Sequence, residues 1–231
     1  MTTIRKNQKV LTEDQQELFK NTIIQLIEDG TFRSIVLHHA DMSHQMHGTG
    51  TDHYLGYHRF LPWHRVFISE LEKELQKVDS SLFVPYWKWT EDRDIPEWLK
   101  DFMPSGIVDE DGDPLEITRT PGTNPDSPIP ELGLIQNIMS ETTYHRFAIR
   151  LEHAHNFIHS WIGGRMNDIL YSPSDPLFWF HHTEIDRLWH EWQKDNPVEE
   201  PFLVGEEAIM DPWMKTASDV KNINSLDYKY E

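Results

Sequence analysis

The stretch from His155 to His182 constrains the fold of this chain more than any other part of its sequence. His155 and His159 lie four residues apart, so a helix would point both imidazoles from the same face. Pro176 suits the first turn of a second helix, which would bring His182 to the pair from another direction. Phenylalanine and tryptophan residues surround these histidines, and a polar group buried among them needs a partner. We therefore expect the three imidazoles to bind a metal ion, although imidazole suits copper, zinc, iron and nickel alike.

The upstream half of the chain carries a second group of histidines. His64 lies in the segment Phe-Leu-Pro-Trp-His-Arg at residues 60–65, in which Pro62 favours the start of a helix. More histidines precede this segment, namely His38, His39, His44, His47, His53 and His58. Two helix pairs that both carry histidines predict two metal ions side by side in the core of a helical bundle.

The rest of the pattern predicts helices joined by irregular loops. Thr12 and Gln15 fit a capping box at the start of a helix, and Gly30 suits its end. The aromatic segment 84–89 is expected to belong to the core. Further helices are expected from residue 31 to about 38–44, over 140–159 and from 176 onward, with loops at 48–57 and in the proline-rich segment 91–130.

Four motifs resemble the tyrosinase and catechol oxidase family, the dinuclear (type-3) copper proteins. They are Phe-Leu-Pro-Trp-His-Arg at 60–65, Val-Pro-Tyr-Trp-Lys-Trp at 84–89, His-Asn-x-x-His-x-Trp-Ile-Gly-Gly at 155–164 and Asp-Pro-x-Phe-x-x-His-His-x-x-x-Asp-Arg-x-Trp at 175–189. The resemblance covers about residues 12–192. It implies a mainly α fold, with a four-helix bundle around two copper ions and long irregular loops. We expect one domain over 1–231, in which 197–231 form a C-terminal tail.

The resemblance also implies which histidines bind copper. For the first ion it favours His39, which follows an apolar helix face, together with His64. For the second ion it implies His155 and His159 with the second member of the adjacent pair His181 and His182, that is His182.

One ligand of the first copper departs from the family pattern. The family places it nine residues before His64, where this chain has Leu55, which cannot bind copper. In an extended loop His53 would share the side of Leu55, whereas in a helical turn His58 would share it. Both histidines stay candidates, as does a site that lacks one ligand.

Glu152 and Asn156 are the candidate catalytic residues. Glu152 lies about one helical turn before His155, so it could simply orient an imidazole. In the family, an acidic residue before the histidine pair and an asparagine directly after its first histidine hold a water that deprotonates phenols. Asn156 matches that pattern, while Glu152 lies nearer to His155 than in bacterial relatives. Asp186, four residues after His182, is expected to orient a ligand.

The implied activity is that of a copper oxidase that uses O2 as co-substrate. Such an enzyme ortho-hydroxylates monophenols and oxidises ortho-diphenols to ortho-quinones. The alternatives are a catechol or ortho-aminophenol oxidase without monophenolase activity, and a hemocyanin-like oxygen-binding protein. A zinc protein is a further rival, but His-Asn-Phe-Ile-His lacks the glutamate of the zinc-protease motif His-Glu-x-x-His.

The composition of the chain limits the kinds of molecule that it is expected to bind. A formal net charge of -18 argues against nucleic acid and against an anionic membrane surface as partners. The family resemblance implies a small phenolic substrate as the partner. The chain has no cysteine, which excludes disulfides, thiolate ligands and the Cys–His thioether of some relatives. It shows no apolar leader and no long apolar run, so we expect a cytoplasmic protein, with export by a partner protein as the alternative. No feature specifies an oligomeric state.

Overall fold

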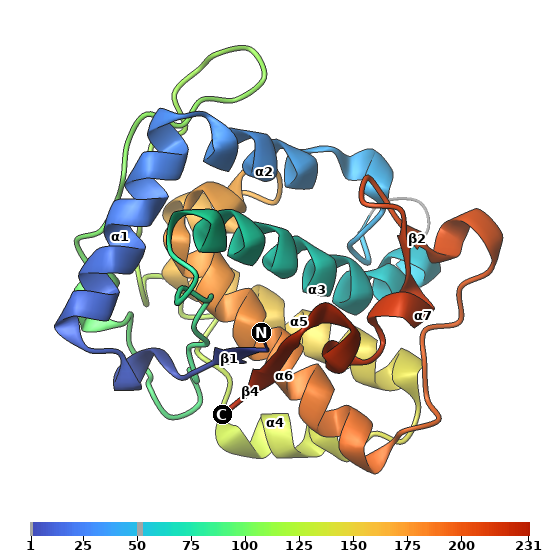
Figure 1. Ribbon diagram of the computed structural model, residues 1–231. Coiled ribbons are helices and arrows are strands. Elements are labelled where there is room, and N and C mark those ends of the chain that lie inside the picture. Colours follow the sequence, from blue (N-terminus) through green and yellow to red (C-terminus); the bar gives the residue numbers. More distant parts are fainter. Residues whose placement is uncertain (1, 50–52) are drawn as a thin grey trace.

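Four helices form the centre of the computed structural model, which describes residues 2–49 and 53–231. They are α2 (Thr31–Ala40), α3 (His53–Val78), α5 (Tyr144–Ile162) and α6 (Pro176–Asp195). Helix α3 contacts α2, α5 and α6, and it runs through the middle of the molecule with α6 and α5 against it (Figure 1). The structure therefore confirms the prediction of a mainly helical bundle.

Helix α1 (Glu13–Glu28) packs on α2 and α3 and begins as the sequence predicts. The Gln15 N–H donates to Thr12 Oγ1 at 3.3 Å, and the Thr12 N–H donates to Gln15 Oε1 at 3.0 Å. This reciprocal pair is a capping box, which satisfies backbone donors that the first turn of a helix leaves free. Gly30, at φ 81°, separates α1 from α2.

The start of α3 corrects the prediction of a loop up to residue 57 and a helix that opens at Pro62. The helix already begins at His53, so Pro62 lies in its interior. A proline has no N–H to give to the carbonyl four residues earlier, here that of His58. The Tyr144 hydroxyl from α5 donates to this carbonyl at 3.2 Å. An interhelical hydrogen bond thus replaces the missing one, and the helix continues through the proline.

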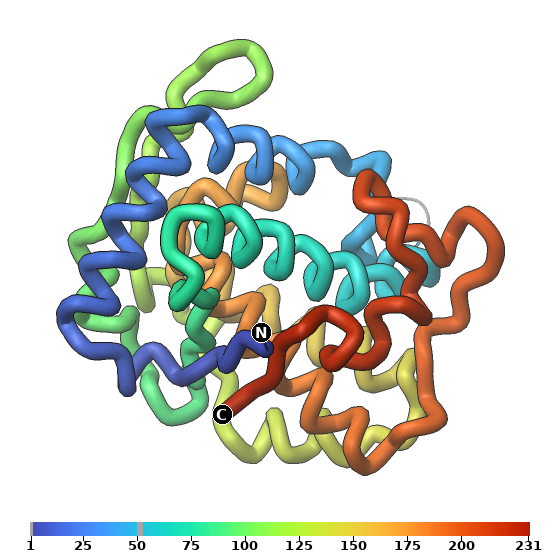
Figure 2. Tube along the Cα trace, in the orientation of Figure 1, coloured from blue at the N-terminus to red at the C-terminus, as the bar shows by residue number. Residues whose placement is uncertain are grey.

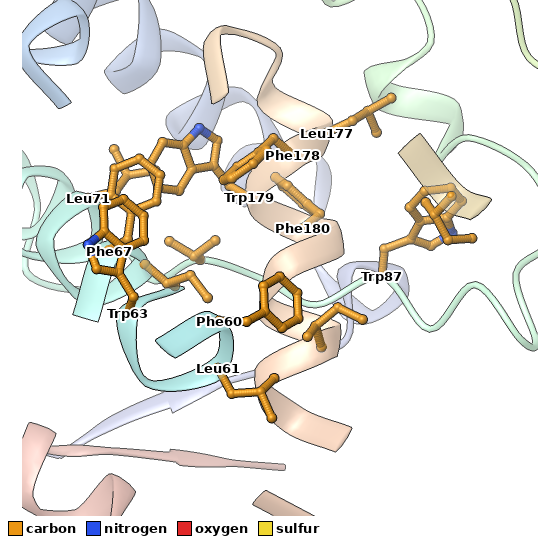
Figure 3. Packing of buried hydrophobic residues seen from close by; sticks show 14 of the residues in the cluster. Phe60, Leu61, Trp63, Phe67, Leu71, Trp87, Leu177, Phe178, Trp179 and Phe180 are labelled. Atoms are coloured by element: carbon orange, nitrogen blue, oxygen red, sulfur yellow. The ribbon is translucent and has the colours of Figure 1, made fainter. Parts of the chain in front are cut away.

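Aromatic side chains fill the space between α3 and α6. Phe67 from α3 lies with its ring centroid 4.6 Å from that of Trp179 and 5.9 Å from that of Phe178, both from α6 (Figure 3). Trp87 and Trp89, from the aromatic segment 84–89, are fully buried. The prediction that this segment belongs to the core is therefore confirmed.

The long segment between α3 and α5 is mostly irregular, as predicted, but it contains helix α4 (Leu132–Met139), which the sequence reading did not identify. Arg33 on α2 binds this segment through the carbonyls of Val108 and Asp109, at 3.1 and 2.6 Å. Gly163 and Gly164 end α5 with φ values of 67° and 54°, and a Cβ on Gly164 would lie 2.0 Å from a carbonyl of the same irregular segment. The Gly-Gly motif thus allows the loop to pack closely against the end of α5.

The remaining elements are short. They are strands β1 (Thr3–Arg5), β2 (Ile209–Met210), β3 (Lys215–Thr216) and β4 (Tyr228–Tyr230), helix α7 (Ala217–Val220), and 3-10 helices η1 (Gln8–Val10), η2 (Met42–His44), η3 (Glu97–Leu99), η4 (Gly164–Asn167), η5 (Ser172–Ser174), η6 (Gly205–Ala208) and η7 (Ile223–Leu226). Strands β2 and β3 pair antiparallel. Strand β1 pairs parallel with β4, so the two ends of the chain lie next to each other (Figure 2).

Asp186 joins the C-terminal tail to the bundle. Its carboxylate accepts a hydrogen bond from Arg65 Nε and another from the Tyr228 hydroxyl, both at 2.5 Å, and Arg5 Nη1 lies 3.4 Å away. The prediction that Asp186 orients a metal ligand is wrong, because its partners are arginines and tyrosines. Among the described residues, no helix is long and apolar enough to cross a bilayer.

Candidate metal centre

One histidine triad comes from two helices. His155 and His159 lie one turn apart on α5, and His182 faces them from α6. The Nε2 atom of His182 lies 3.0 Å from that of His155 and 3.3 Å from that of His159. We call these three residues the helix triad.

A second triad lies beside the first and takes one member from a loop. His39 comes from α2 and His64 from α3, while His47 comes from the segment between η2 and α3. All three are buried, and their ligand atoms lie within 4.8 Å of one another. The Nε2 atoms of His39 and His47 are 3.2 Å apart. We call these three residues the loop triad.

The two triads touch. The rings of His64 and His182 stack with centroids 4.4 Å apart, and those of His47 and His155 lie 6.1 Å apart. Two groups of three imidazoles therefore face each other in the core of the bundle, an arrangement consistent with a dinuclear metal site.

The structure brings together five of the seven predicted ligands, His39, His64, His155, His159 and His182, and leaves out His53 and His58. His53 Nδ1–H donates to the Gly48 carbonyl at 2.8 Å. His58 accepts the Phe202 N–H at 2.9 Å and contacts His145 at 3.0 Å.

The third member of the loop triad is His47, which sequence reasoning named but did not select. The extension of α3 explains why the expected positions fail. Nine helical residues make about 2.5 turns, so Leu55 faces away from His64, and His53 lies about 16 Å farther along the axis. A ligand in a loop has no fixed spacing from its partners, so the motif gave no signal for His47.

Oxygen acceptors hold the Nδ1 atoms of four triad histidines. The Nδ1–H of His64 donates to the Phe60 carbonyl at 2.8 Å, and that of His159 donates to the Met166 carbonyl at 2.6 Å. His39 has the Leu170 carbonyl at 3.2 Å, and His155 has Asn156 Oδ1 at 3.0 Å. With the proton on Nδ1, the Nε2 lone pair of each ring is free to bind a metal.

These four rings and that of His182 are held neutral. Burial is the main cause that lowers the pKa of His39, His64, His155 and His182 well below the usual value. It also lowers the pKa of His159 to about 4. Neutral imidazole is the form that binds metals.

This donor set fits metal ions. Nε2 lone pairs that face each other at 3.0 to 3.3 Å repel unless a cation lies between them. Metal–nitrogen bonds of about 2 Å bring two ligand nitrogens to about this separation. His64 Nε2 is buried and has no hydrogen-bond partner among the described residues.

His181 is a buried neighbour of the helix triad. Its ring stacks on His155 with centroids 4.9 Å apart and 12° between the planes. Its ligand atom belongs to the same cluster as those of the helix triad. The Nε2 atom of His182, however, is the one that contacts both His155 and His159, as expected for the second member of the pair.

A cavity of about 580 Å³ opens onto both triads. His39 and His47 of the loop triad line it, as do His155 and His159 of the helix triad. The two candidate catalytic residues also line it. Phe157 and Ile169, 36% and 43% exposed, lie at its edge, so the cavity reaches solvent.

Glu152 is buried in the wall of this cavity, at 2% exposure. Its Oε1 accepts the Gly48 N–H at 2.9 Å and lies 3.4 Å from His47 Nδ1. Its Oε2 is buried and has no hydrogen-bond partner among the described residues. Asn156 lies one turn farther along α5 and is exposed.

Comparisons with known proteins agree with this geometry. The family profile "Common central domain of tyrosinase" matches residues 29–130 and 117–195. A tyrosinase of Streptomyces antibioticus is 31% identical over 88% of this chain and 87% of its own length. Hemocyanin 2 of Megathura crenulata is 30% identical over 82% of this chain, which spans only 6% of that protein.

A solved functional unit of octopus hemocyanin has the same fold. It superposes with a TM-score of 0.78 at 23% identity and covers 99% of this chain and 68% of its own. The profile match extends over most of the chain and includes the residues of both triads. The chain belongs to the tyrosinase family of type-3 copper proteins.

Proposed function

We propose that this protein is a tyrosinase that binds two copper ions and uses O2 to ortho-hydroxylate monophenols and oxidise ortho-diphenols to ortho-quinones. The observation that carries the proposal is the cavity of about 580 Å³ that leads from solvent to both histidine triads. Cavities of this size admit small organic ligands. An oxygen carrier with the same triads must keep phenols out, whereas this site is open to them.

Each triad would hold one copper ion through the three free Nε2 atoms. Copper, when bound, supplies the redox chemistry and the activation of O2, while the protein supplies geometry and a shaped pocket. Buried aromatic rings around the triads, such as Phe178 stacked on His182 with centroids 3.9 Å apart, keep the imidazoles in place. Phe157, Met166 and Ile169 give the cavity an apolar wall for a phenol ring.

Hydroxylation of a monophenol also needs a base, because the phenol must lose its proton before it can bind copper. We assign this task to a water held between Glu152 Oε2 and Asn156. The support is that both residues line the cavity and that Oε2 has no hydrogen-bond partner among the described residues. A positioned base of this kind contributes about 10² to 10⁴ in rate. Without it, the enzyme would be a catechol or ortho-aminophenol oxidase.

Oxygen uptake by the copper-loaded protein tests the activity, with a monophenol and the matching ortho-diphenol as substrates. We expect turnover of both. Two bound coppers with reversible O2 binding but no phenol turnover would make the protein a carrier. A preference for zinc over copper in metal analysis would overturn the proposal altogether.

Asn156→Ala tests the base separately. It removes one holder of the water and should lower monophenol turnover by at least about tenfold more than diphenol turnover. Asn156→Asp is the control for His155, because it keeps an oxygen that accepts the Nδ1–H of His155. If the ratio of monophenol to diphenol turnover is unchanged in Asn156→Ala, this residue takes no part in proton transfer.

A further inference from the structure

His47 is the triad member that no helix holds. It lies between η2, which ends at His44, and α3, which begins at His53. The other members of both triads have their backbones fixed by helical hydrogen bonds. A ligand on a free loop would have to be ordered when copper binds, and that ordering costs backbone conformational entropy. The protein therefore needs another way to order His47.

Gly48, the residue after His47, has both its N–H and its carbonyl group hydrogen-bonded. The Gly48 N–H donates to Glu152 Oε1 at 2.9 Å, and the Gly48 carbonyl accepts from His53 Nδ1–H at 2.8 Å. The first contact joins the loop to α5, and the second joins it to the start of α3. Gly48 is thus held by two of the four helices that carry the metal centre.

Close packing supports these two hydrogen bonds. The His47 carbonyl lies against Gly56 of α3, so closely that a Cβ on Gly56 would be 1.7 Å from the oxygen. Gly48 lies against the Tyr57 ring in the same way, with 2.2 Å from an added Cβ to the nearest ring atom. At Gly56 a larger residue would push the loop backbone away, and at Gly48 it would displace the Tyr57 ring.

Glu152 also faces the ring of His47. Its Oε1 lies 3.4 Å from His47 Nδ1, on the side of the ring opposite to Nε2, which points at His39. A carboxylate in this position favours the proton on Nδ1 and leaves Nε2 for the metal. The same oxygen thus contacts both the backbone and the ring of the loop ligand.

We propose that Glu152 and His53 are positioning residues that fix His47 as a ligand of the first copper. The two residues form a clip on Gly48, and Glu152 also orients the His47 imidazole. The proposal rests on the proposed function in that it takes His47 to be a copper ligand. It gives the two oxygens of Glu152 separate tasks, with Oε1 in the clip and Oε2 at the proposed water.

Copper binding to Glu152 variants tests the clip. Loss of a group that orients a ligand typically weakens metal binding about 10- to 100-fold. In a titration of the metal-free protein with copper against a competing chelator, Glu152→Ala should lose affinity at one site by this factor and keep it at the other. Glu152→Gln retains an acceptor oxygen for Gly48 and His47, so it should bind both coppers nearly as the wild type does.

His53→Ala provides the second variant, at an exposed position where a failure to fold is not expected. It should weaken the same single site, by a smaller factor than Glu152→Ala. Glu191→Ala removes a carboxylate of α6 that pairs with Lys194 at the surface. This matched control should leave both sites unchanged. Thermal unfolding of the metal-free variants verifies the fold.

Equal binding of both coppers by Glu152→Ala and the wild type would overturn the clip, and so would equal losses in Glu152→Gln and Glu152→Ala. Failure of the proposed function has a different signature. If His47→Gln keeps both coppers, His47 is not a ligand, and if the wild type binds no copper, the oxidase proposal fails whatever the clip does.

Discussion

The helix triad and the loop triad place three imidazoles in similar arrangements on different backbones. His155, His159 and His182 all lie on helices, and Asp175 caps the start of α6 by accepting the Leu177 N–H at 2.9 Å. The loop triad has two helical members and His47. The backbone of a helical ligand is fixed by its own helix, whereas the backbone of a loop ligand is fixed by tertiary contacts. The two triads therefore differ in how far sequence spacing can predict them and in what can disrupt them.

The largest expected effect separates His47 from His53, one of the two candidates that flank Leu55. His47→Gln should lower bound copper from two ions to one per chain and reduce diphenol oxidation by at least about 100-fold, because metal catalysis supplies several kcal/mol of the lowered barrier. His53→Gln should keep two coppers. Metal analysis after dialysis, with oxygen uptake on the same samples, makes the comparison. If His53→Gln loses a copper and His47→Gln does not, the loop triad is wrong.

A smaller effect is expected from the backbone contact behind His47. In Gly56→Ala the added Cβ would meet the His47 carbonyl, and such overpacking costs about 1 to 3 kcal/mol of unfolding free energy. The loop must shift, so copper binding should weaken at one site only. Urea unfolding and copper titration measure the two effects.

Gly133→Ala is the matched control for that substitution. Gly133 is exposed on α4, with no atom within 4 Å of an added Cβ. It should gain about 0.5 to 1 kcal/mol of stability from helix propensity and bind copper normally. A Gly56→Ala variant that resembles Gly133→Ala in both measurements would show that the loop is not held by this contact.

The third prediction concerns the hydrogen bond that supports α3 at Pro62, and it expects a change in stability but not in copper content. Tyr144→Phe leaves the His58 carbonyl without a donor, which costs about 1 to 3 kcal/mol when the group is buried. Both coppers should still bind, because Tyr144 belongs to neither triad. Pro62→Ala restores an N–H for this carbonyl, so the cost of Tyr144→Phe should shrink in that background. If the stability costs of the two substitutions simply add in a double-mutant cycle, the Tyr144 hydroxyl does not compensate for the missing N–H of Pro62.

The same comparison shows how far the sequence alone can go. Helix capping and the i, i+4 spacing of His155 and His159 follow from local geometry, so the start of α1, the start of α6 and the helix triad could be predicted. Pro62 led to a wrong prediction because a local rule places proline at the start of a helix. The hydroxyl of Tyr144, which is distant in the sequence, donates the hydrogen bond that the proline cannot give to the His58 carbonyl. The identity of His47 depends on the packing of a loop against Gly56 and Glu152, which no spacing encodes.

The last prediction concerns His58, one of the two predicted ligands that lie outside both triads. Burial, and then the neighbouring His145, lower the pKa of His58 to about 4. Its usual pKa in an unfolded chain is about 6.5, so as the pH falls from there towards 4 the unfolded chain binds a proton that the folded one does not. The wild type therefore loses folding free energy over this range.

His58→Asn should not share that loss, although its oxygen can still accept the Phe202 N–H. The substitution should thus destabilise the metal-free protein more at pH 7.5 than at pH 5, as measured by urea unfolding. Copper should not alter the difference, because His58 belongs to neither triad. A difference that is the same at both pH values would mean that His58 titrates normally. A difference that appears only with copper bound would tie His58 to the metal centre after all.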